Sequence, residues 1–125
     1  MQQAKEVYEG VGGANVEAEA ETVIAEVTGI VTGAGHNQVF LEAMAVITAT
    51  AGATELTLRV RREGVAGTEV AKLVVSAVKS AKQEIGFQCN DIQPAELTGA
   101  KYVLTLTSAA AEKQKSVSSR ITATA

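Results

Sequence analysis

The chain has 125 residues and a net charge of −3, from 14 acidic and 11 basic residues. This length predicts one domain, and the absence of a basic excess disfavours nucleic acid as a partner. A single cysteine excludes an internal disulfide and a cysteine-rich zinc site, and no segment approaches the ~20 apolar residues of a membrane span.

Residues 1–20 differ in composition from the rest of the chain, because glycines interrupt any regular element and glutamates add charge. We expect an extended N-terminal arm here, and a single β-sandwich domain over residues 21–125. Two interpretations of the arm stay open: a frayed terminus, or a segment that grips a neighbouring subunit through Val7 and Tyr8. The first six residues lack the layout of a signal peptide, so we expect the chain to remain where it is made.

Strand-like segments follow at regular spacing, each rich in β-branched residues and bounded by glycine-containing breaks. They cover residues 22–31, 38–50, 54–62, 102–107 and 117–121. The segment 54–62 alternates most cleanly, with Leu56, Leu58 and Val60 on one face. Its other face carries Thr57, Arg59 and Arg61.

The stretch 68–87 supports two interpretations. Its apolar residues fit a helical stripe, with Thr68 as N-cap and Gly86 as C-cap. A period-2 face also runs through Leu73 and Val75, and residues 79–82 can divide the stretch into two strands. We favour two strands because the flanking segments are sheet-like. The chain then has seven or eight strands, typical of an all-β antiparallel sandwich, with a jelly roll favoured over an immunoglobulin-like arrangement.

The apolar residues predict a thin core. Alanine inflates the hydrophobic fraction of 46%, and aromatic residues make up only 3%. A buried valine or leucine contributes about 1.5–3 kcal/mol, and an alanine offers much less apolar area. We therefore expect stability to come partly from surface buried between subunits.

Catalytic, metal and cofactor chemistry find little support, so we predict no enzyme, no cofactor and no metal. His36 and Asp91 are the only histidine–aspartate pair that a hydrolytic triad could use, and no nucleophile-elbow motif accompanies them. The Gly33-Ala34-Gly35 loop lacks the further glycine and lysine of a phosphate cradle. Cys89 has no neighbouring cation in sequence, so we expect a half-buried, unreactive thiol.

Arg59, Arg61 and Arg62 are the one concentrated basic patch. They fit either a docking surface for an acidic partner or a solvated strand face that prevents wrong edge pairing. Together with Val7 and Tyr8, Arg59 and Arg61 are our candidate protein-interface residues.

Two motifs carry a resemblance to a known family. The first runs from the arginine-bearing strand at Leu58 into a glycine-rich turn that ends in Gly67-Thr68. The second is Asp91-Ile92-Gln93-Pro94, followed by the Tyr-x-Leu strand at Tyr102. Both are similar to motifs of small jelly-roll virion proteins of tailed bacteriophages, over roughly residues 39–123. Glu63 before Gly64 and the helix-compatible stretch after Thr68 depart from that pattern.

The resemblance implies a capsid decoration or cement protein, found in the virion after assembly in the host cytoplasm. Its expected partners are the major capsid protein or another virion protein, and its expected state is a homotrimer. A second resemblance, of residues 97–102 to the tyrosine corner of immunoglobulin-like sandwiches, implies the alternative: a receptor-binding appendage module of a phage tail or head fibre.

Overall fold

The computed structural model describes the backbone of residues 7–12, 15–16, 21–32, 35–49, 55–76, 82–108 and 114–124. Every regular element in these ranges is a β-strand. The strands are β1 (Val7–Gly12), β2 (Asn15–Val16), β3 (Thr22–Val31), β4 (Gln38–Ala49), β5 (Glu55–Arg62), β6 (Glu69–Ser76), β7 (Lys82–Ile92), β8 (Thr98–Ser108) and β9 (Gln114–Thr124).

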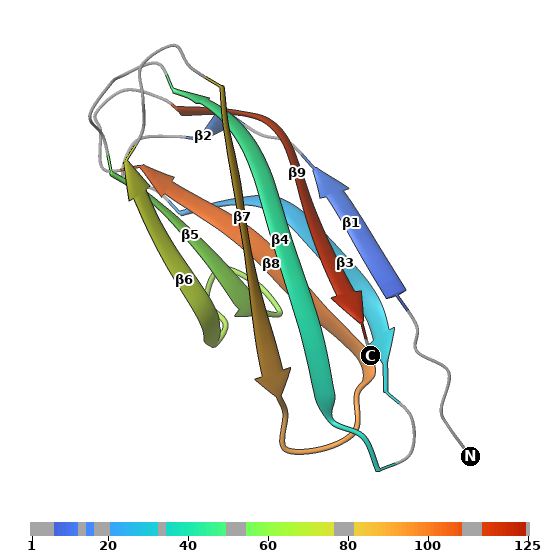
Figure 1. Cartoon of the computed structure of the whole chain (residues 1–125). Helices are drawn as coiled ribbons and strands as arrows, with labels where there is room; N and C mark the ends of the chain where they lie inside the picture. The colour runs from blue at the N-terminus through green and yellow to red at the C-terminus, as the bar shows by residue number, and fades with distance from the viewer. Residues whose placement is uncertain are drawn as a thin grey trace.

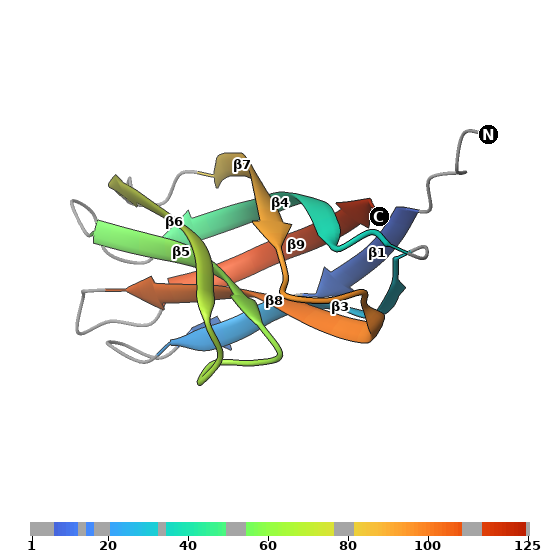
Figure 2. The same cartoon turned by 90° about the horizontal axis from the view of Figure 1, so that it is seen from below.

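The strands form two antiparallel sheets that pack face to face (Figures 1 and 2). Sheet A has the order β1-β9-β4-β7, with the two-residue β2 also paired to β9. Sheet B has the order β3-β8-β5-β6. The predicted antiparallel sandwich is confirmed.

The pairing of the strands identifies the type of sandwich. Without β2, eight strands remain, and the first half of the chain pairs with the second half in reverse order: β1 with β9, β3 with β8, β4 with β7 and β5 with β6. This is one long antiparallel hairpin wound into two sheets. The fold is a jelly roll.

The ambiguous stretch after Thr68 forms strands. Strand β6 pairs with β5, and β7 pairs with β4 across eleven residue pairs from Gln38↔Ile92 to Thr48↔Lys82. The choice of two strands is confirmed and the helix is wrong, because the inward faces of both strands contribute side chains to the core.

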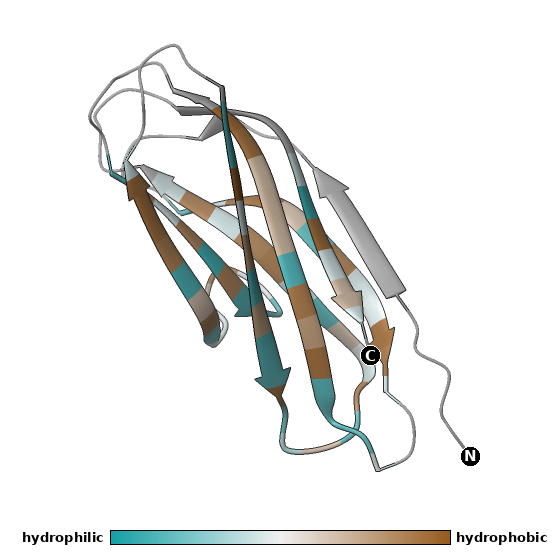
Figure 3. Ribbon diagram, viewed as in Figure 1, coloured by the Kyte–Doolittle hydropathy of each residue, from teal (hydrophilic) through white to brown (hydrophobic). Residues whose placement is uncertain are grey.

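The core lies between the sheets and follows the period-2 pattern. Leu56, Leu58 and Val60 are fully buried, and the residues between them are partly exposed. Figure 3 shows β4, in the interior of sheet A, as mostly hydrophobic, with a hydrophilic band near the middle of the strand. Several inward residues of β6 and β7 are only partly buried, although Ile85 on β7 is buried: Val70, Leu73 and Val75 on β6, and Phe87 and Cys89 on β7. The sandwich is therefore more open on its β6/β7 side.

The opposite side is closed by a hydrogen bond between the sheets. Strand β3 has a register shift between Val23 and Ala25 that leaves Ile24 out of the pairing with β8. The hydroxyl of Ser119 on β9 donates to the Ile24 carbonyl. A bulge in a strand leaves one residue unpaired, and here its carbonyl finds a partner in the other sheet.

Strands β1 and β2 lie within the predicted N-terminal arm. Both pair with β9, and the β1 register runs from Val7↔Thr124 to Gly12↔Ser119. Gly10, which we expected to interrupt any element, lies inside β1. Strand β1 is therefore the edge of sheet A opposite β7.

The turn between β5 and β6 is held tightly. Arg62 N–H donates to the Thr68 carbonyl at 3.0 Å, and Gly67 N–H donates to the Gly64 carbonyl at 2.9 Å. Glu63 lies in the left-handed region with a φ of 70°, and its N–H donates to the Lys101 carbonyl at 2.9 Å. A left-handed conformation of a non-glycine residue is costly and persists where surrounding structure imposes it.

We expect Gly67→Ala to lower the free energy of unfolding by about 3 kcal/mol. A Cβ at this position would lie 1.6 Å from the Arg62 carbonyl oxygen, so the backbone of the turn must move. Urea denaturation measures the change. Gly64→Ala in the same turn is the control, because its Cβ would meet nothing within 4 Å. Equal stability of the two variants would contradict the tight turn.

Candidate functional site

The residues that could have supported catalysis are kept apart. His36 is exposed between β3 and β4, and its carbonyl accepts a hydrogen bond from the Thr32 hydroxyl at 2.6 Å. Asp91 is buried at the end of β7, and its carboxylate accepts bonds from Arg62 and Tyr102. The described residues therefore show no His36–Asp91 pair of the kind a triad would need.

Other chemistry also lacks a built site in the described part of the chain. No three metal-ligating side chains among these residues lie close enough to hold an ion. None of the described segments is a helix long and apolar enough to cross a membrane. Gly33 and Ala34 of the glycine loop lie outside the described residues, and Gly35 has a φ of 78°.

The most ordered polar cluster surrounds Asp91, and we call Asp91, Arg62, Tyr102 and Gln93 the buried cluster. Arg62 donates to both carboxylate oxygens, from Nε at 2.7 Å and from Nη2 at 2.6 Å. The Tyr102 hydroxyl donates to Asp91 Oδ2 at 2.6 Å and accepts from Gln93 Nε2 at 2.9 Å. The cluster therefore joins β7 of sheet A to β5 and β8 of sheet B.

The electrostatics of the buried cluster favour the ionised carboxylate. Burial alone would raise the pKa of Asp91, but the hydrogen bonds from Arg62 and Tyr102 and the charge of Arg62 lower it below its usual value. Burial, and then the bond to Asp91, raise the pKa of Tyr102 far above its usual value. These groups stabilise one another and leave no base free to take a proton.

The hydrogen bond of Tyr102 shows that the predicted resemblance of residues 97–102 to a tyrosine corner is wrong. In a tyrosine corner the hydroxyl bonds back to the main chain a few residues upstream. Here the Tyr102 hydroxyl donates to a side chain eleven residues upstream. The implied immunoglobulin-like topology is also absent from the described sheets, which have the jelly-roll order.

The strand parity of Arg62 could have indicated the cluster from the sequence. On β5, Arg62 follows Leu56, Leu58 and Val60 at even spacing, so it falls on the inward face. Asp91 has the same parity as the core residue Ile85 on β7. Two opposite charges at inward positions predict an ion pair, because buried charges are nearly always paired.

The outward arginines of β5 form a second network, and we call Glu21, Arg59, Arg61, Glu69 and Thr105 the outer network. Arg61 donates to both Glu21 oxygens, at 2.6 and 3.0 Å, and Arg59 donates to Glu69 at 2.8 Å. The Thr105 hydroxyl donates to Glu21 at 2.7 Å. The bond from Arg61, its charge and that of Arg59 lower the pKa of Glu21.

The outer network leaves Arg59 and Arg61 less available to an acidic partner than the sequence suggested. Arg59 and Arg61 side chains are only 22% and 18% exposed, and each guanidinium already has a carboxylate partner within the subunit. Val7 and Tyr8 lie on β1 in sheet A, whereas the two arginines lie on β5 in sheet B. The four candidate interface residues therefore belong to different sheets.

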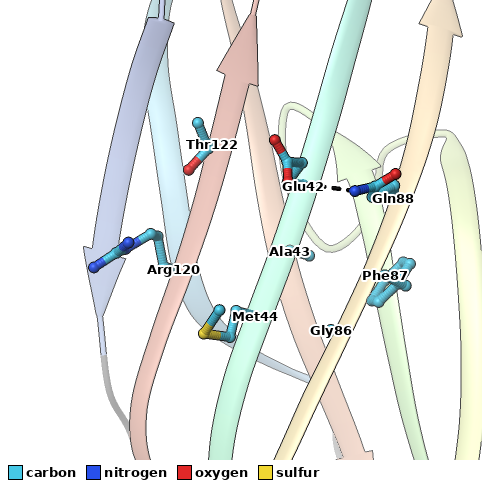
Figure 4. Close-up of a pocket in the computed structure, with 8 residues that line it drawn as sticks. All are labelled: Glu42, Ala43, Met44, Gly86, Phe87, Gln88, Arg120 and Thr122. Carbon is cyan, nitrogen blue, oxygen red and sulfur yellow. Dashed lines mark hydrogen bonds between the residues drawn. The ribbon is translucent and has the colours of Figure 1, made fainter.

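A hollow of about 630 Å³ lies on sheet A (Figure 4). Its lining residues come from β4, β7 and β9: Glu42, Ala43, Met44, Gly86, Phe87, Gln88, Arg120 and Thr122. Gly86 is paired with Met44 and has no side chain, which leaves space beside the half-exposed Met44. The lining mixes polar and apolar groups without a nucleophile beside a base, so it suits a surface contact better than a reaction.

Comparisons with known proteins show the fold and no family. No protein-family model matches the sequence, and no curated protein matches it. The chain is similar in structure to chains of infectious bursal disease virus particles.

In the T13 viral particle of that virus, 95% of this chain matches 31% of the viral chain, with a TM-score of 0.61 and 11% identity. In the VP2 subviral particle, 96% of this chain matches 32%, with a TM-score of 0.59 and 10% identity. In the Gt strain structure, 96% of this chain matches 33% of the viral chain, with a TM-score of 0.57 and 12% identity. The chain thus spans about a third of the length of these viral chains.

These matches confirm a β-sandwich of the kind found in viral capsid proteins. They do not test the resemblance to virion proteins of tailed bacteriophages, because none of the three is a protein of such a phage. Membership of that group stays a prediction.

We expect the buried cluster to make the free energy of unfolding depend on pH. The folded pKa of Asp91 is below its unfolded value of about 3.9, so its contribution is present above about pH 4 and is lost as pH falls through the folded pKa. Asp91→Asn should lower the free energy of unfolding by about 2–3 kcal/mol at pH 7, because Arg62 is left unpaired. The deficit should shrink as the pH falls. Urea denaturation between pH 7 and pH 2.5 measures this.

The control for Asp91→Asn is Glu84→Gln on β7, where the carboxylate is exposed. Its effect should stay within about 0.5 kcal/mol at every pH. A deficit for Asp91→Asn that persisted unchanged in acid would contradict the role of the ionised carboxylate.

We expect Cys89 to react slowly with a thiol reagent. Burial, and then the charge of Asp91, raise the pKa of its thiol to about 11. At pH 8 the thiolate fraction should be roughly 200-fold below that of a free cysteine with a pKa of about 8.5. The higher nucleophilicity of a more basic thiolate offsets part of this loss, so labelling by Ellman's reagent should be more than about tenfold slower. The same protein unfolded in guanidinium should label at the ordinary rate. Labelling of the folded protein within tenfold of that rate would contradict the buried environment.

Proposed function

We propose that this protein is a structural subunit of a virus particle that decorates and stabilises a tailed-bacteriophage capsid. The main support for this proposal is the jelly-roll strand order together with the likeness in fold to capsid proteins. The viral setting rests on that likeness of fold, and the bacteriophage setting rests on the sequence motifs at Leu58–Thr68 and Asp91–Tyr102. The protein would be found in the virion and act without enzymatic activity.

The mechanism we propose is the burial of surface between subunits. The core has few aromatic residues and includes small side chains such as Ala25, Ala43 and Ala45. Each subunit that bridges neighbouring capsid proteins removes apolar surface from water, at about 25 cal/mol per Å² of apolar area. A standard interface buries about 800 Å² on each partner. The closed shell is then harder to open, because opening it re-exposes that surface.

Two kinds of surface are proposed for these contacts. The outward face of β5, with Arg59 and Arg61, presents a strand face that the outer network has already made rigid. Strand β1, with Val7 and Tyr8, is the edge of sheet A, and an edge strand offers unpaired backbone groups to a neighbour. We propose a homotrimer and contacts with the major capsid protein through these surfaces.

We expect the purified protein to sediment with shells of the virus that encodes it, when those shells are assembled without it. Bound protein should raise the temperature at which the shells open, measured by differential scanning fluorimetry of the shell. Light scattering of the free protein should give three times the monomer mass. Shells lacking any bound protein, with an unchanged opening temperature, would contradict the proposed function.

A further inference from the structure

Glu63 occupies a position that glycine fills without strain. Its φ of 70° lies in the left-handed region, where a side chain clashes with the main chain. The turn around it is fixed by the Glu63 N–H bond to Lys101 and by the Arg61 guanidinium, which donates to the Gly67 carbonyl at 3.0 Å. The chain is therefore held in a conformation that disfavours this residue.

The hydrogen bonds of the turn hold the Glu63 main chain in place, but its side chain gains no partner in the described part of the subunit. Glu63 is exposed, and among the described residues its carboxylate makes no hydrogen bond or ion pair. The nearest cations in sequence and pairing are engaged elsewhere: Arg62 with Asp91, and Lys101 with Glu26. Strained residues that persist often serve a function, and here the free group is an exposed carboxylate on a rigid turn.

Two like charges lie opposite each other on the outward face of sheet B. Lys72 on β6 is exposed and is paired directly with Arg59 on β5, so two like charges face each other. Around Arg59, Arg61 and Lys72 the described carboxylates are Glu21 and Glu69, and the arginines use both.

The carboxylate at the start of β5 is too distant to balance Lys72. Glu55 is four residues from Arg59 along β5, roughly 13 Å away at ~3.3 Å per residue. That is beyond the screening distance of about 8 Å at physiological salt. One further carboxylate would therefore neutralise this part of sheet B.

We propose that the turn at residues 63–67 docks on the sheet B face of a second copy of this chain, with the Glu63 carboxylate against Lys72 of that copy. The proposal rests on the self-association named under the proposed function. Val65, which is 42% exposed in the same turn, adds apolar area to the contact. The strain at Glu63 is then offset in the assembly, because the side chain gains a charged partner that the subunit does not provide.

The turn and Lys72 belong to the same hairpin, formed by β5 and β6. Two copies can exchange the contact reciprocally across a two-fold axis, and more copies can pass it round a closed ring. Sedimentation gives the number of copies directly. Charge complementarity between the two surfaces is the reason for choosing a second copy as the occupant.

The experiment is a charge exchange. Sedimentation velocity over a range of concentrations gives the dissociation constant for self-association of wild type, Glu63→Lys, Lys72→Glu and the double variant. Each single reversal should weaken self-association by about tenfold or more, because it places like charges together. The double variant should recover to within about threefold of wild type, because it restores opposite charges across the contact. Glu84→Lys, an exposed glutamate on β7, should leave the constant unchanged.

A second readout separates the contact from misfolding. Glu63→Lys keeps a non-glycine residue at the strained position, so its melting temperature at a concentration where wild type is dissociated should match that of wild type. A wild type that stays monomeric at all concentrations, an unchanged constant for Glu63→Lys, or a double variant that does not recover would each overturn the proposal.

Shell binding tells this proposal apart from the proposed function. If the protein sediments with shells while self-association ignores Glu63→Lys, the turn contact is wrong and the capsid role stands. If the charge exchange behaves as expected and shells bind no protein, the contact stands and the capsid role fails.

Discussion

The ion pair between Asp91 and Arg62 is the contact on which one end of the sandwich depends. It joins β7 of sheet A to β5 of sheet B, and Tyr102 connects the same carboxylate to β8. A buried carboxylate without partners would be unfavourable by several kcal/mol, whereas this one accepts three short bonds. The two sheets are therefore held in one relative position, because any shift would break bonds to an otherwise isolated charge.

This tie matters because it adds directional contacts to a core that is almost entirely aliphatic. Among the described residues most of the buried hydrophobic side chains are leucine, isoleucine and valine, and Tyr102 is the largest fully buried side chain. Hydrophobic burial is non-directional, so hydrogen bonds define the relative position of the sheets more sharply. The bond from Ser119 to the Ile24 carbonyl acts in the same way from β9 to β3. Polar bonds on separate strands thus add direction to an arrangement that the aliphatic core stabilises by burial.

Sequence periodicity was sufficient to predict the strands from β3 onward and the sandwich. The even spacing of Leu56, Leu58 and Val60 gave the buried face of β5 correctly. Periodicity could not predict which distant strands pair. Strand β1, for example, pairs with β9 at the other end of the chain. Glycine content misled at β1: Gly10 disfavours a strand locally, yet pairing with β9 places it in one.

Only part of the buried cluster was indicated by the sequence. Asp91 and Tyr102 carried the motifs of the resemblance, but the third partner, Arg62, was grouped with the outward arginines as one basic patch. The parity of β5 separates them: Arg59 and Arg61 face outward, and Arg62 faces the other way, toward Asp91. The apparent patch is two networks on opposite faces of one strand. Each arginine of β5 has an acidic partner inside the subunit, so a neighbour that approaches sheet B meets a largely neutralised surface. Lys72 has no carboxylate partner among the described residues, so an added carboxylate gains most there.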